Sequence, residues 1–148
     1  LNIGQAKVST SGQEAFELGY LRKGIDCISV NTEKLIQDAK EKVILLDNLG
    51  YTKPIKRTNI KVLGNQALGM FLVGADSFKE GDYITEHEKL MSEKLAHVLC
   101  GGNLSSPTYV SEQYLLDLER EAFLSLCGEA KTLERIKYML EKGKPLRN

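Results

Sequence analysis

Glycines divide this chain into segments of helical length, and this punctuation limits its fold more than any other feature. Amphipathic patterns run up to Gly19, Gly50, Gly101 and Gly143 and stop there. Glycine commonly ends a helix because it readily adopts the left-handed conformation that other residues avoid. We therefore predict an all-α fold of five to six amphipathic helices with little strand.

Two helices are predicted before residue 51. Residues 11–14, Ser-Gly-Gln-Glu, have capping-box spacing, in which a hydroxyl and a carboxylate bond the free amides of a first helical turn. Either Asn31 or Thr32 can cap the second helix. Its apolar residues repeat at helical spacing, and they are Leu35, Ala39, Val43 and Leu46.

The middle of the chain is predicted to hold a loop and then two helices. Residues 51–63 indicate a loop with a short strand at its end. Residues 64–79 are apolar enough for a helix, although Gly69 and Gly74 each cost about 1 kcal/mol relative to alanine and indicate a bend or close packing. Residues 85–88 form a second capping box. The buried face expected for the helix that follows consists of Met91, Leu95 and Val98.

The tail is predicted to form two helices. Ser111 would cap the first, whose apolar stripe is Tyr114, Leu115, Leu118, Ala122 and Leu126. Thr132 would cap the second, which ends at Gly143. The residues expected to face inward on this last helix are Leu133, Ile136 and Leu140.

Composition narrows the possible partners. The chain has 148 residues, enough for one domain, with 20 basic and 20 acidic side chains, so no net field favours nucleic acid or an anionic membrane. Three widely spaced cysteines argue against a disulfide framework and for a reducing compartment. No apolar run could span a bilayer, and no secretion signal opens the sequence. We predict a soluble cytoplasmic protein.

Candidate chemistry in the sequence is sparse. His97 and Cys100 lie three apart on a predicted helix and could share a metal ion, but no further ligand stands at a supporting spacing, so we expect no metal site. Gly101-Gly102 follows a helix, which favours a helix end over a phosphate-binding turn. The pairs Glu86/Glu88 and Glu119/Glu121 point in different directions on their helices and indicate solvated faces. We predict no catalytic residue.

One local concentration of positive charge remains. The segment from residue 48 to residue 75 has no acidic residue. Its cations are Lys53, Lys56, Arg57 and Lys61. They could meet a phosphate or form a solvated linker, and no aromatic residues interleave for base stacking, so we expect no nucleic-acid binding.

Two stretches resemble the crotonase (enoyl-CoA hydratase/isomerase) family. Residues 7–21, KVSTSGQEAFELGYL, are similar to the capped helix that follows the family's catalytic region, and residues 139–145, MLEKGKP, are similar to its usual ending. Gly143 replaces a commonly basic residue, and Met139 replaces a commonly aromatic one. The resemblance implies an organisation of residues 1–50 as the end of a crotonase-like region, 51–63 as a basic loop and 64–148 as a C-terminal helical region, all in one compact unit.

A more specific resemblance covers nearly the whole chain. Residues 95–102, LAHVLCGG, together with residues 112–123, EQYLLDLEREAF, are similar to the C-terminus of bacterial 3-hydroxyacyl-CoA dehydrogenases that carry a fused enoyl-CoA hydratase portion. Leu1 in place of an initiator methionine also leads us to expect an excised segment. The resemblance implies a piece of a fatty-acid β-oxidation enzyme of lipid metabolism, both oxidoreductase and lyase.

The resemblance also implies where function lies. The parent chain would bind NAD and a CoA thioester, whereas these residues lack the glycine fingerprint for NAD and the family's catalytic elements, so the isolated segment is expected to be inactive. Its closing helices would serve assembly and contact the CoA end of an acyl-CoA substrate through Lys142, with Lys144 second. Alternatively, the two lysines serve only to stabilise the C-terminus of the last helix through its dipole.

A stand-alone helical interaction module is the alternative to this enzyme segment. The expected partners of the segment are the rest of the parent polypeptide and, through exposed apolar faces, further copies in a homo-oligomer.

Overall fold

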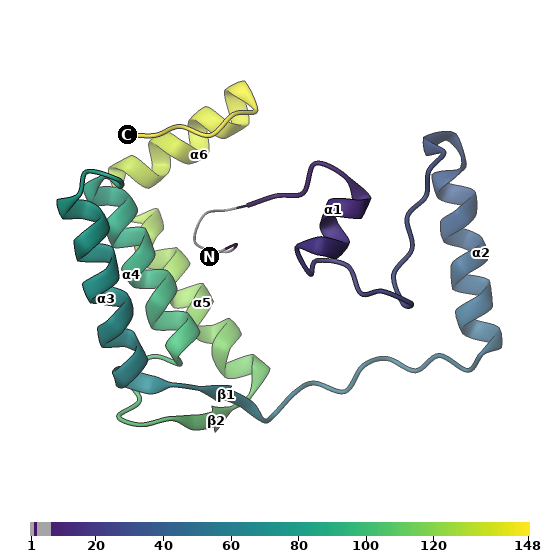
Figure 1. Ribbon diagram of the computed structural model, residues 1–148, viewed down its shortest axis with the longest axis horizontal. Coiled ribbons are helices and arrows are strands. Elements are labelled where there is room, and N and C mark those ends of the chain that lie inside the picture. Colours follow the sequence, from purple (N-terminus) through teal and green to yellow (C-terminus); the bar gives the residue numbers. More distant parts are fainter. Residues whose placement is uncertain (1, 3–6) are drawn as a thin grey trace. The chain divides into compact units, whose positions relative to one another are not determined.

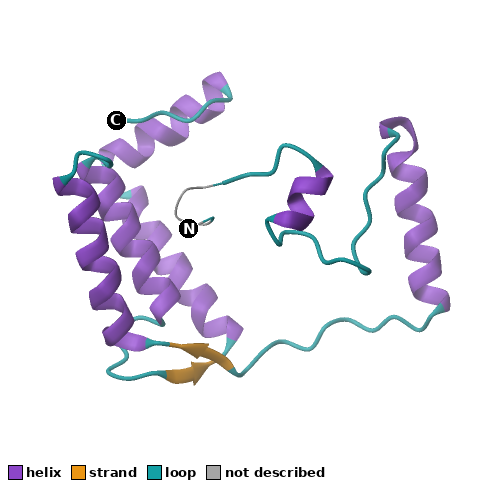
Figure 2. Cartoon of the chain, viewed as in Figure 1, coloured by secondary structure: helices purple, strands orange, loops and turns teal. Residues whose placement is uncertain are grey.

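The structure is a computed structural model that describes residue 2 and residues 7–148 (Figures 1 and 2). Within these residues it is mostly helical, which confirms the predicted all-α class. The elements are α1 (Gly12–Glu17), the 3₁₀ turn η1 (Thr32–Lys34), α2 (Leu35–Asn48), β1 (Ile60–Val62), α3 (Gly64–Glu80), α4 (Glu86–Cys100), β2 (Thr108–Val110), α5 (Glu112–Cys127) and α6 (Ala130–Lys142).

The chain divides into two compact units, Leu1–Ile55 and Lys56–Asn148. The boundary between them falls inside the predicted loop of residues 51–63. The first unit holds α1, η1 and α2, and the second holds the other elements.

The first unit begins its helices as the sequence predicts, with one variation. The Ser11 hydroxyl accepts a hydrogen bond from the Glu14 amide at 3.1 Å, and Gly19 takes the left-handed conformation just after α1. The Glu14 carboxylate reaches one residue further back than in a capping box and accepts from the Thr10 amide at 2.7 Å. Asn31 caps η1, which runs directly into α2.

The predicted apolar stripe of α2 forms on the helix but is largely uncovered. Leu35 and Val43 are more than half exposed, and Leu46 is half-buried. The stripe therefore has the expected helical spacing without a layer of side chains over it among the described residues of its own unit.

In the second unit, α4 packs against both α3 and α5, with the strands at one end of this layer and α6 at the other (Figure 1). Strand β1 pairs antiparallel with β2, and Lys61 lies opposite Tyr109. Gly64 joins β1 to α3 at φ +64°, where an added Cβ would lie 2.6 Å from the Leu104 carbonyl oxygen. Only glycine fits this junction without displacing the backbone.

Helix α4 has both predicted ends. The Thr85 hydroxyl accepts from the Glu88 amide at 3.2 Å, and the Glu88 carboxylate accepts from the Thr85 amide at 2.8 Å, which confirms the capping box. Gly101 is left-handed, and its amide and that of Gly102 bond carbonyls of the last turn. Gly101-Gly102 is thus a helix end, as predicted.

The core of the second unit is made of small side chains. Its buried hydrophobic residues are Val62, Ala67, Ala75, Ala96 and Cys100, and no large side chain among the described residues is fully buried. The predicted inner face of α4 is wrong in part: Met91 is exposed, whereas Leu95 and Val98 are half-buried and His87 is buried. Gly69 and Gly74 have no atom within 4 Å of an added Cβ, so neither glycine serves close packing here.

Helix α5 largely follows its prediction, and α6 follows its own only at its end. Ser111 caps α5, and four residues of the predicted stripe are half-buried, whereas Tyr114 is exposed at 36%. The four are Leu115, Leu118, Ala122 and Leu126. Helix α6 begins at Ala130 after Glu129, so Thr132 lies inside its first turn and is not its cap. The residues expected to face inward on α6 are exposed instead, and they are Leu133, Ile136 and Leu140. Left-handed Gly143 ends the helix as predicted.

No helix in the described part of the chain is both long and apolar enough to cross a membrane. The three cysteines are free thiols: Cys27 is exposed, Cys127 is half-buried and Cys100 is buried.

Candidate functional site: the α4–α6 polar cluster

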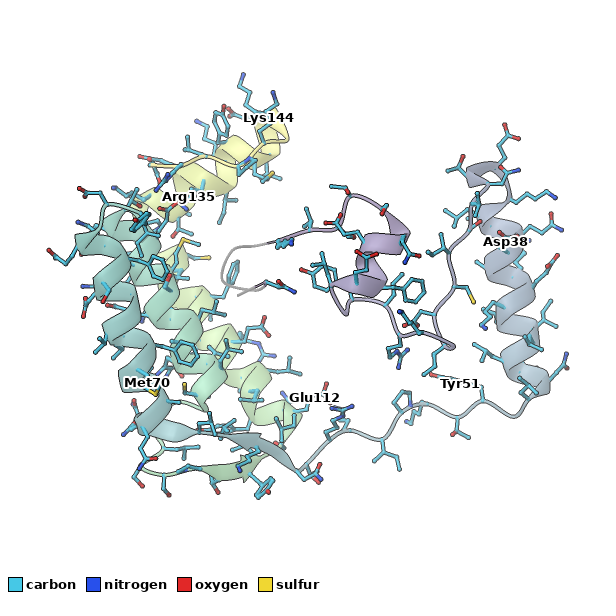
Figure 3. The ribbon with its side chains drawn as sticks, in the orientation of Figure 1. Asp38, Tyr51, Met70, Glu112, Arg135 and Lys144 are labelled. Atoms are coloured by element: carbon cyan, nitrogen blue, oxygen red, sulfur yellow. The ribbon has the colours of Figure 1, made fainter. Side chains whose placement is uncertain are left out.

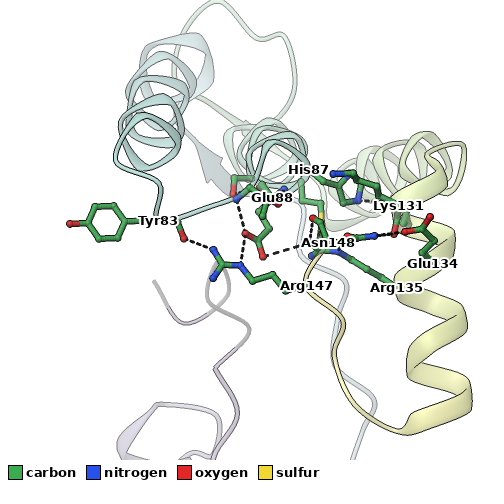
Figure 4. A network of polar contacts seen from close by, with 12 residues as sticks. Tyr83, His87, Glu88, Lys131, Glu134, Arg135, Arg147 and Asn148 are labelled. Atoms are coloured by element: carbon green, nitrogen blue, oxygen red, sulfur yellow. Dashed lines mark hydrogen bonds and ion pairs between the residues drawn. The ribbon is translucent and has the colours of Figure 1, made fainter.

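A network of polar contacts in the second unit joins the start of α4 to α6 and to the last two residues of the chain (Figure 4). We call this set the α4–α6 polar cluster. It consists of Thr85, His87, Glu88, Thr132, Arg135, Arg147 and Asn148. Because α4 has a fixed start at its capping box, the first-turn side chains of α4 are the rigid part of the cluster.

Glu88 is the centre of the cluster. Beyond its bond from the Thr85 amide, its carboxylate lies 3.3 Å from Arg147 Nε and 3.6 Å from an Arg135 guanidinium nitrogen. Burial acts to raise the pKa of Glu88, but the Thr85 amide and the two guanidinium groups outweigh it and hold that pKa below its ordinary value. Glu88 is therefore a structural anion, which corrects the prediction that Glu86 and Glu88 form a solvated face.

The last two residues tie α6 to the turn before α4. Arg147 donates to the Tyr83 carbonyl at 2.8 Å. The Asn148 side-chain oxygen accepts from Arg135 Nε at 2.7 Å, and its amide nitrogen donates to Glu134 at 2.7 Å and to the Lys131 carbonyl at 3.3 Å (Figure 4). The C-terminal residues thus bond several groups along the first two turns of α6.

His87 is the one buried polar or charged side chain among the described residues, at 5% exposure. Its Nε2 lies 3.0 Å from the Thr132 hydroxyl, which joins α4 to α6. Burial lowers the pKa of His87 below its ordinary value of 6.5, and the positive charges of Arg135 and Lys131 lower it further. The imidazole is therefore neutral at pH 7. One hydrogen bond joins its Nε2 to the Thr132 hydroxyl, and the tautomer of the ring decides which of the two donates.

An open cavity of about 340 Å³ lies beside His87. Its lining residues are Glu86, His87, Lys89, Leu90, Glu93, Glu129 and Lys131. The charges of this lining are mixed, and Lys89 is held by Asp76 at 2.5 Å and by Glu93 at 3.8 Å. Salt bridges hold Glu86, Lys89 and Glu93, and a hydrogen bond joins His87 to Thr132 on α6. These contacts fix α6 on α4 rather than pairing a nucleophile with a base.

The predicted CoA-contacting lysines lie outside the cluster. Lys142 occupies the last turn of α6, and Lys144 follows Gly143 (Figure 3). Both side chains are exposed. Their position at a helix C-terminus favours the helix dipole, and their reach into solvent leaves them able to contact an anion.

The other sequence candidates are dispersed. Cys100 is buried, and burial raises the pKa of its thiol, while His97 is half-buried on the same helix. The part of the chain that the structure describes holds no group of three His, Cys, Asp or Glu placed to bind a metal. Glu119 and Glu121 are exposed on α5, as predicted.

The basic segment is divided between the units. Lys53 belongs to the first unit, and Lys56, Arg57 and Lys61 belong to the second, all with exposed side chains. The Arg57 carbonyl accepts from the Glu112 amide at 2.8 Å, which ties the backbone of this segment to the start of α5. A phosphate contact of these cations stays a prediction.

Comparison with known proteins gives one informative match. No protein-family model and no solved structure matches the chain. A protein of Bacillus subtilis (strain 168) named "Probable 3-hydroxyacyl-CoA dehydrogenase" is 47% identical over 146 residues. The chain aligns with the C-terminal part of that protein. The alignment takes in 99% of this chain and 18% of the relative, so the chain spans less than a fifth of the relative's length.

This match bears on the two resemblances differently. It confirms the similarity to the C-terminal part of a 3-hydroxyacyl-CoA dehydrogenase. The fused enoyl-CoA hydratase portion, and with it the crotonase resemblance, stays a prediction.

Sequence reasoning missed most of the polar cluster. It singled out Thr85 and Glu88 as a cap, because capping is local, but it placed Thr132 at a helix start and gave Arg135 and Arg147 no role. Their contacts with His87 and Glu88 cross 45 to 59 positions of the chain. The only local signal for this role was weak. Arg135 lies on the polar side of a helix that already has a continuous apolar side.

Proposed function

We propose that this chain is the C-terminal helical part of a fatty-acid β-oxidation enzyme, a 3-hydroxyacyl-CoA dehydrogenase with a fused enoyl-CoA hydratase portion. The observation that carries the proposal is the 47% identity that extends over 99% of the chain. In this proposal the chemistry, with NAD and the acyl-CoA thioester, belongs to parts of the parent polypeptide outside these residues. The segment itself serves assembly in the cytoplasm and contacts the CoA end of the substrate.

Exposed apolar side chains support the assembly role. On α3, Met70, labelled in Figure 3, is 78% exposed. Phe71 and Phe78 are more than half exposed. Soluble monomers rarely leave large apolar patches in water, and such patches mark contact surfaces. Together with a core of alanine, valine and cysteine, these faces favour a segment that completes its packing against more polypeptide.

The CoA contact is proposed for Lys142 and Lys144. Both are exposed and stand on either side of Gly143, so their ammonium groups can approach a phosphate without disturbing α6. Lysine binds phosphate as a point charge and needs little preorganisation.

The same exposed faces also favour a second candidate, a stand-alone helical interaction module. The two candidates differ in what lies beyond the segment: the module needs only a partner protein, whereas the enzyme segment needs the catalytic parts of its own parent.

Turnover assays on three proteins test the proposal. The 148-residue chain, the full-length parent and the parent lacking this segment are assayed for NAD-dependent oxidation of 3-hydroxyacyl-CoA and for hydration of enoyl-CoA. We expect activity in the parent, none in the isolated chain, and loss of activity or of the native oligomer in the truncated parent. Turnover by the isolated chain would overturn the proposal, as would a truncated parent with full activity and unchanged mass.

Calorimetry with acetyl-CoA tests the lysines. We expect Lys142→Ala to weaken binding to the parent by about three- to tenfold, with a smaller loss for Lys144→Ala, because each removes one phosphate contact at the surface. Lys137→Ala is the matched control, since Lys137 is exposed on the same helix and pairs with Glu141 at 3.9 Å. Equal affinities for Lys142→Ala and Lys137→Ala would remove the CoA contact.

A further inference from the structure

Helix α6 turns its polar side toward its own unit and its apolar side toward water. Thr132 and Arg135 are half-buried and bond α4, whereas Leu133, Ile136 and Leu140 are 53%, 38% and 82% exposed. Amphipathic helices of soluble proteins ordinarily do the reverse. This orientation leaves three apolar side chains at i, i+3 and i+7, which we call the α6 stripe.

Polar contacts hold α6 in this orientation. Asn148 accepts from Arg135 and donates to Glu134 and to the Lys131 backbone, and Arg147 anchors the same C-terminal residues on Glu88. Rotation of the helix to bury the α6 stripe would break these bonds and the His87–Thr132 contact together. The α6 stripe is therefore presented by a specific set of bonds rather than left over by loose packing.

The charge next to the α6 stripe indicates an apolar partner. Lys137 lies on the same side of the helix, one turn from both Leu133 and Leu140, and its ammonium is 3.9 Å from the Glu141 carboxylate. The two charges of this ion pair are opposite, so the pair itself favours neither a basic nor an acidic partner. A surface that covers the stripe gains chiefly from apolar side chains.

We infer that the α6 stripe docks against the part of the parent polypeptide that lies outside these 148 residues, an inference that rests on the proposed function. The chain spans only 18% of its relative, so most of such a parent lies outside it. A face on the same polypeptide acts at an effective concentration of about millimolar, far above that of a second copy in solution. The occupant is accordingly an apolar face of the parent's remaining portion.

Thiol labelling measures whether the α6 stripe is covered. Leu140→Cys is introduced into the 148-residue chain and into the full-length parent, and its alkylation by a small maleimide is followed by mass spectrometry of the peptide that contains it. We expect labelling to be at least about tenfold slower in the parent, because a covered thiol reacts only when the contact opens. Glu121→Cys, on the exposed side of α5, is the matched control and should label at the same rate in both proteins.

The outcomes separate this inference from the proposed function. Equal labelling of Leu140→Cys in both proteins would overturn the docking inference, and turnover by the full-length parent would still leave the proposed function standing. Slow labelling in a parent without dehydrogenase activity would overturn the proposed function and keep the contact. Labelling of the isolated chain that slows as its concentration rises, with a dimeric mass by light scattering, would assign the stripe to a second copy and overturn the inference.

Discussion

Helices α4 and α6 belong to the same unit and share contacts, yet they are held in place by different physics. Helix α4 has a complete capping box, a left-handed glycine at its end and neighbours on both sides. Helix α6 has no side-chain cap and is fixed by hydrogen bonds and ion pairs that come from distant parts of the chain. The start and end of α4 are therefore set by residues in or next to the helix, whereas the orientation of α6 depends on a few contacts with distant residues.

Among the substitutions considered, removal of Glu88 should reduce the stability of the second unit most. Glu88→Ala deletes the carboxylate of the α4 capping box and leaves Arg135 and Arg147 without their shared anion. We expect a loss of about 2 to 3 kcal/mol in the free energy of unfolding, since a cap is worth about 1 kcal/mol and an unpaired, partly covered guanidinium adds to the cost. Urea denaturation of the 148-residue chain, followed by circular dichroism, measures the loss.

Glu86→Ala is the matched control for that experiment. Glu86 is an exposed first-turn carboxylate of the same helix, 3.8 Å from Lys79, and its removal should cost less than about 0.5 kcal/mol. Equal costs for Glu86→Ala and Glu88→Ala would mean that the polar cluster contributes nothing beyond helix electrostatics.

Acid should weaken the α4–α6 connection through His87. Burial and the positive charges of Arg135 and Lys131 lower the pKa of His87 in the folded state below 6.5, and Glu129 and Glu88 oppose this without reversing it. Between those two pKa values the unfolded chain binds the proton and the folded chain does not. The stability that neutral His87 contributes is therefore fully present above about pH 6.5, and it is lost as the pH falls toward the folded-state pKa.

Urea midpoints measured from pH 7 to pH 5 test this dependence. The slope of unfolding free energy against pH should be smaller in His87→Gln than in His97→Gln, since His97 is the other of the two histidines and lies at the far end of α4. Equal slopes in the two variants would show that the proton binds to groups other than His87.

The hydroxyl of Thr132 should matter less than either ionisable group. Thr132→Val keeps the shape of the side chain but removes the partner of His87 Nε2, and we expect a cost of about 1 kcal/mol. Thr132→Ser retains the hydroxyl and should cost less than about 0.5 kcal/mol. Hydrogen exchange across the first turns of α6 measures both, and equal protection in the two variants would contradict the bond.

The comparison of α4 with α6 also shows what the sequence could predict. The boundaries of α4 follow from Thr85, Glu88 and Gly101, all within or next to the helix, and each was predicted correctly. The end of α6 at Gly143 is likewise local. These signals act over a few residues, so they can be read without knowledge of the fold.

The orientation of α6 could not be predicted in the same way. Its pattern correctly identified an amphipathic helix. The rule that apolar residues face inward, however, holds only where the helix packs its apolar side on its own domain. The contacts of Thr132 with His87 and of Arg135 with Glu88 decide which side faces the unit, and those partners are remote in sequence. The same limit applies to Leu35 and Val43 on α2, whose stripe is correct in spacing and exposed.

The smallest expected effect concerns the α6 stripe itself. Leu140 is 82% exposed, so Leu140→Gln removes little covered apolar surface and should change the stability of the 148-residue chain by no more than about 0.5 kcal/mol. Leu118→Gln, at a half-buried position on α5, should cost about 2 kcal/mol or more, because it places an amide among apolar side chains. Urea denaturation of the two variants gives the comparison directly. A large loss in Leu140→Gln would place the α6 stripe against its own unit in solution, and the inverted orientation of α6 would then be wrong.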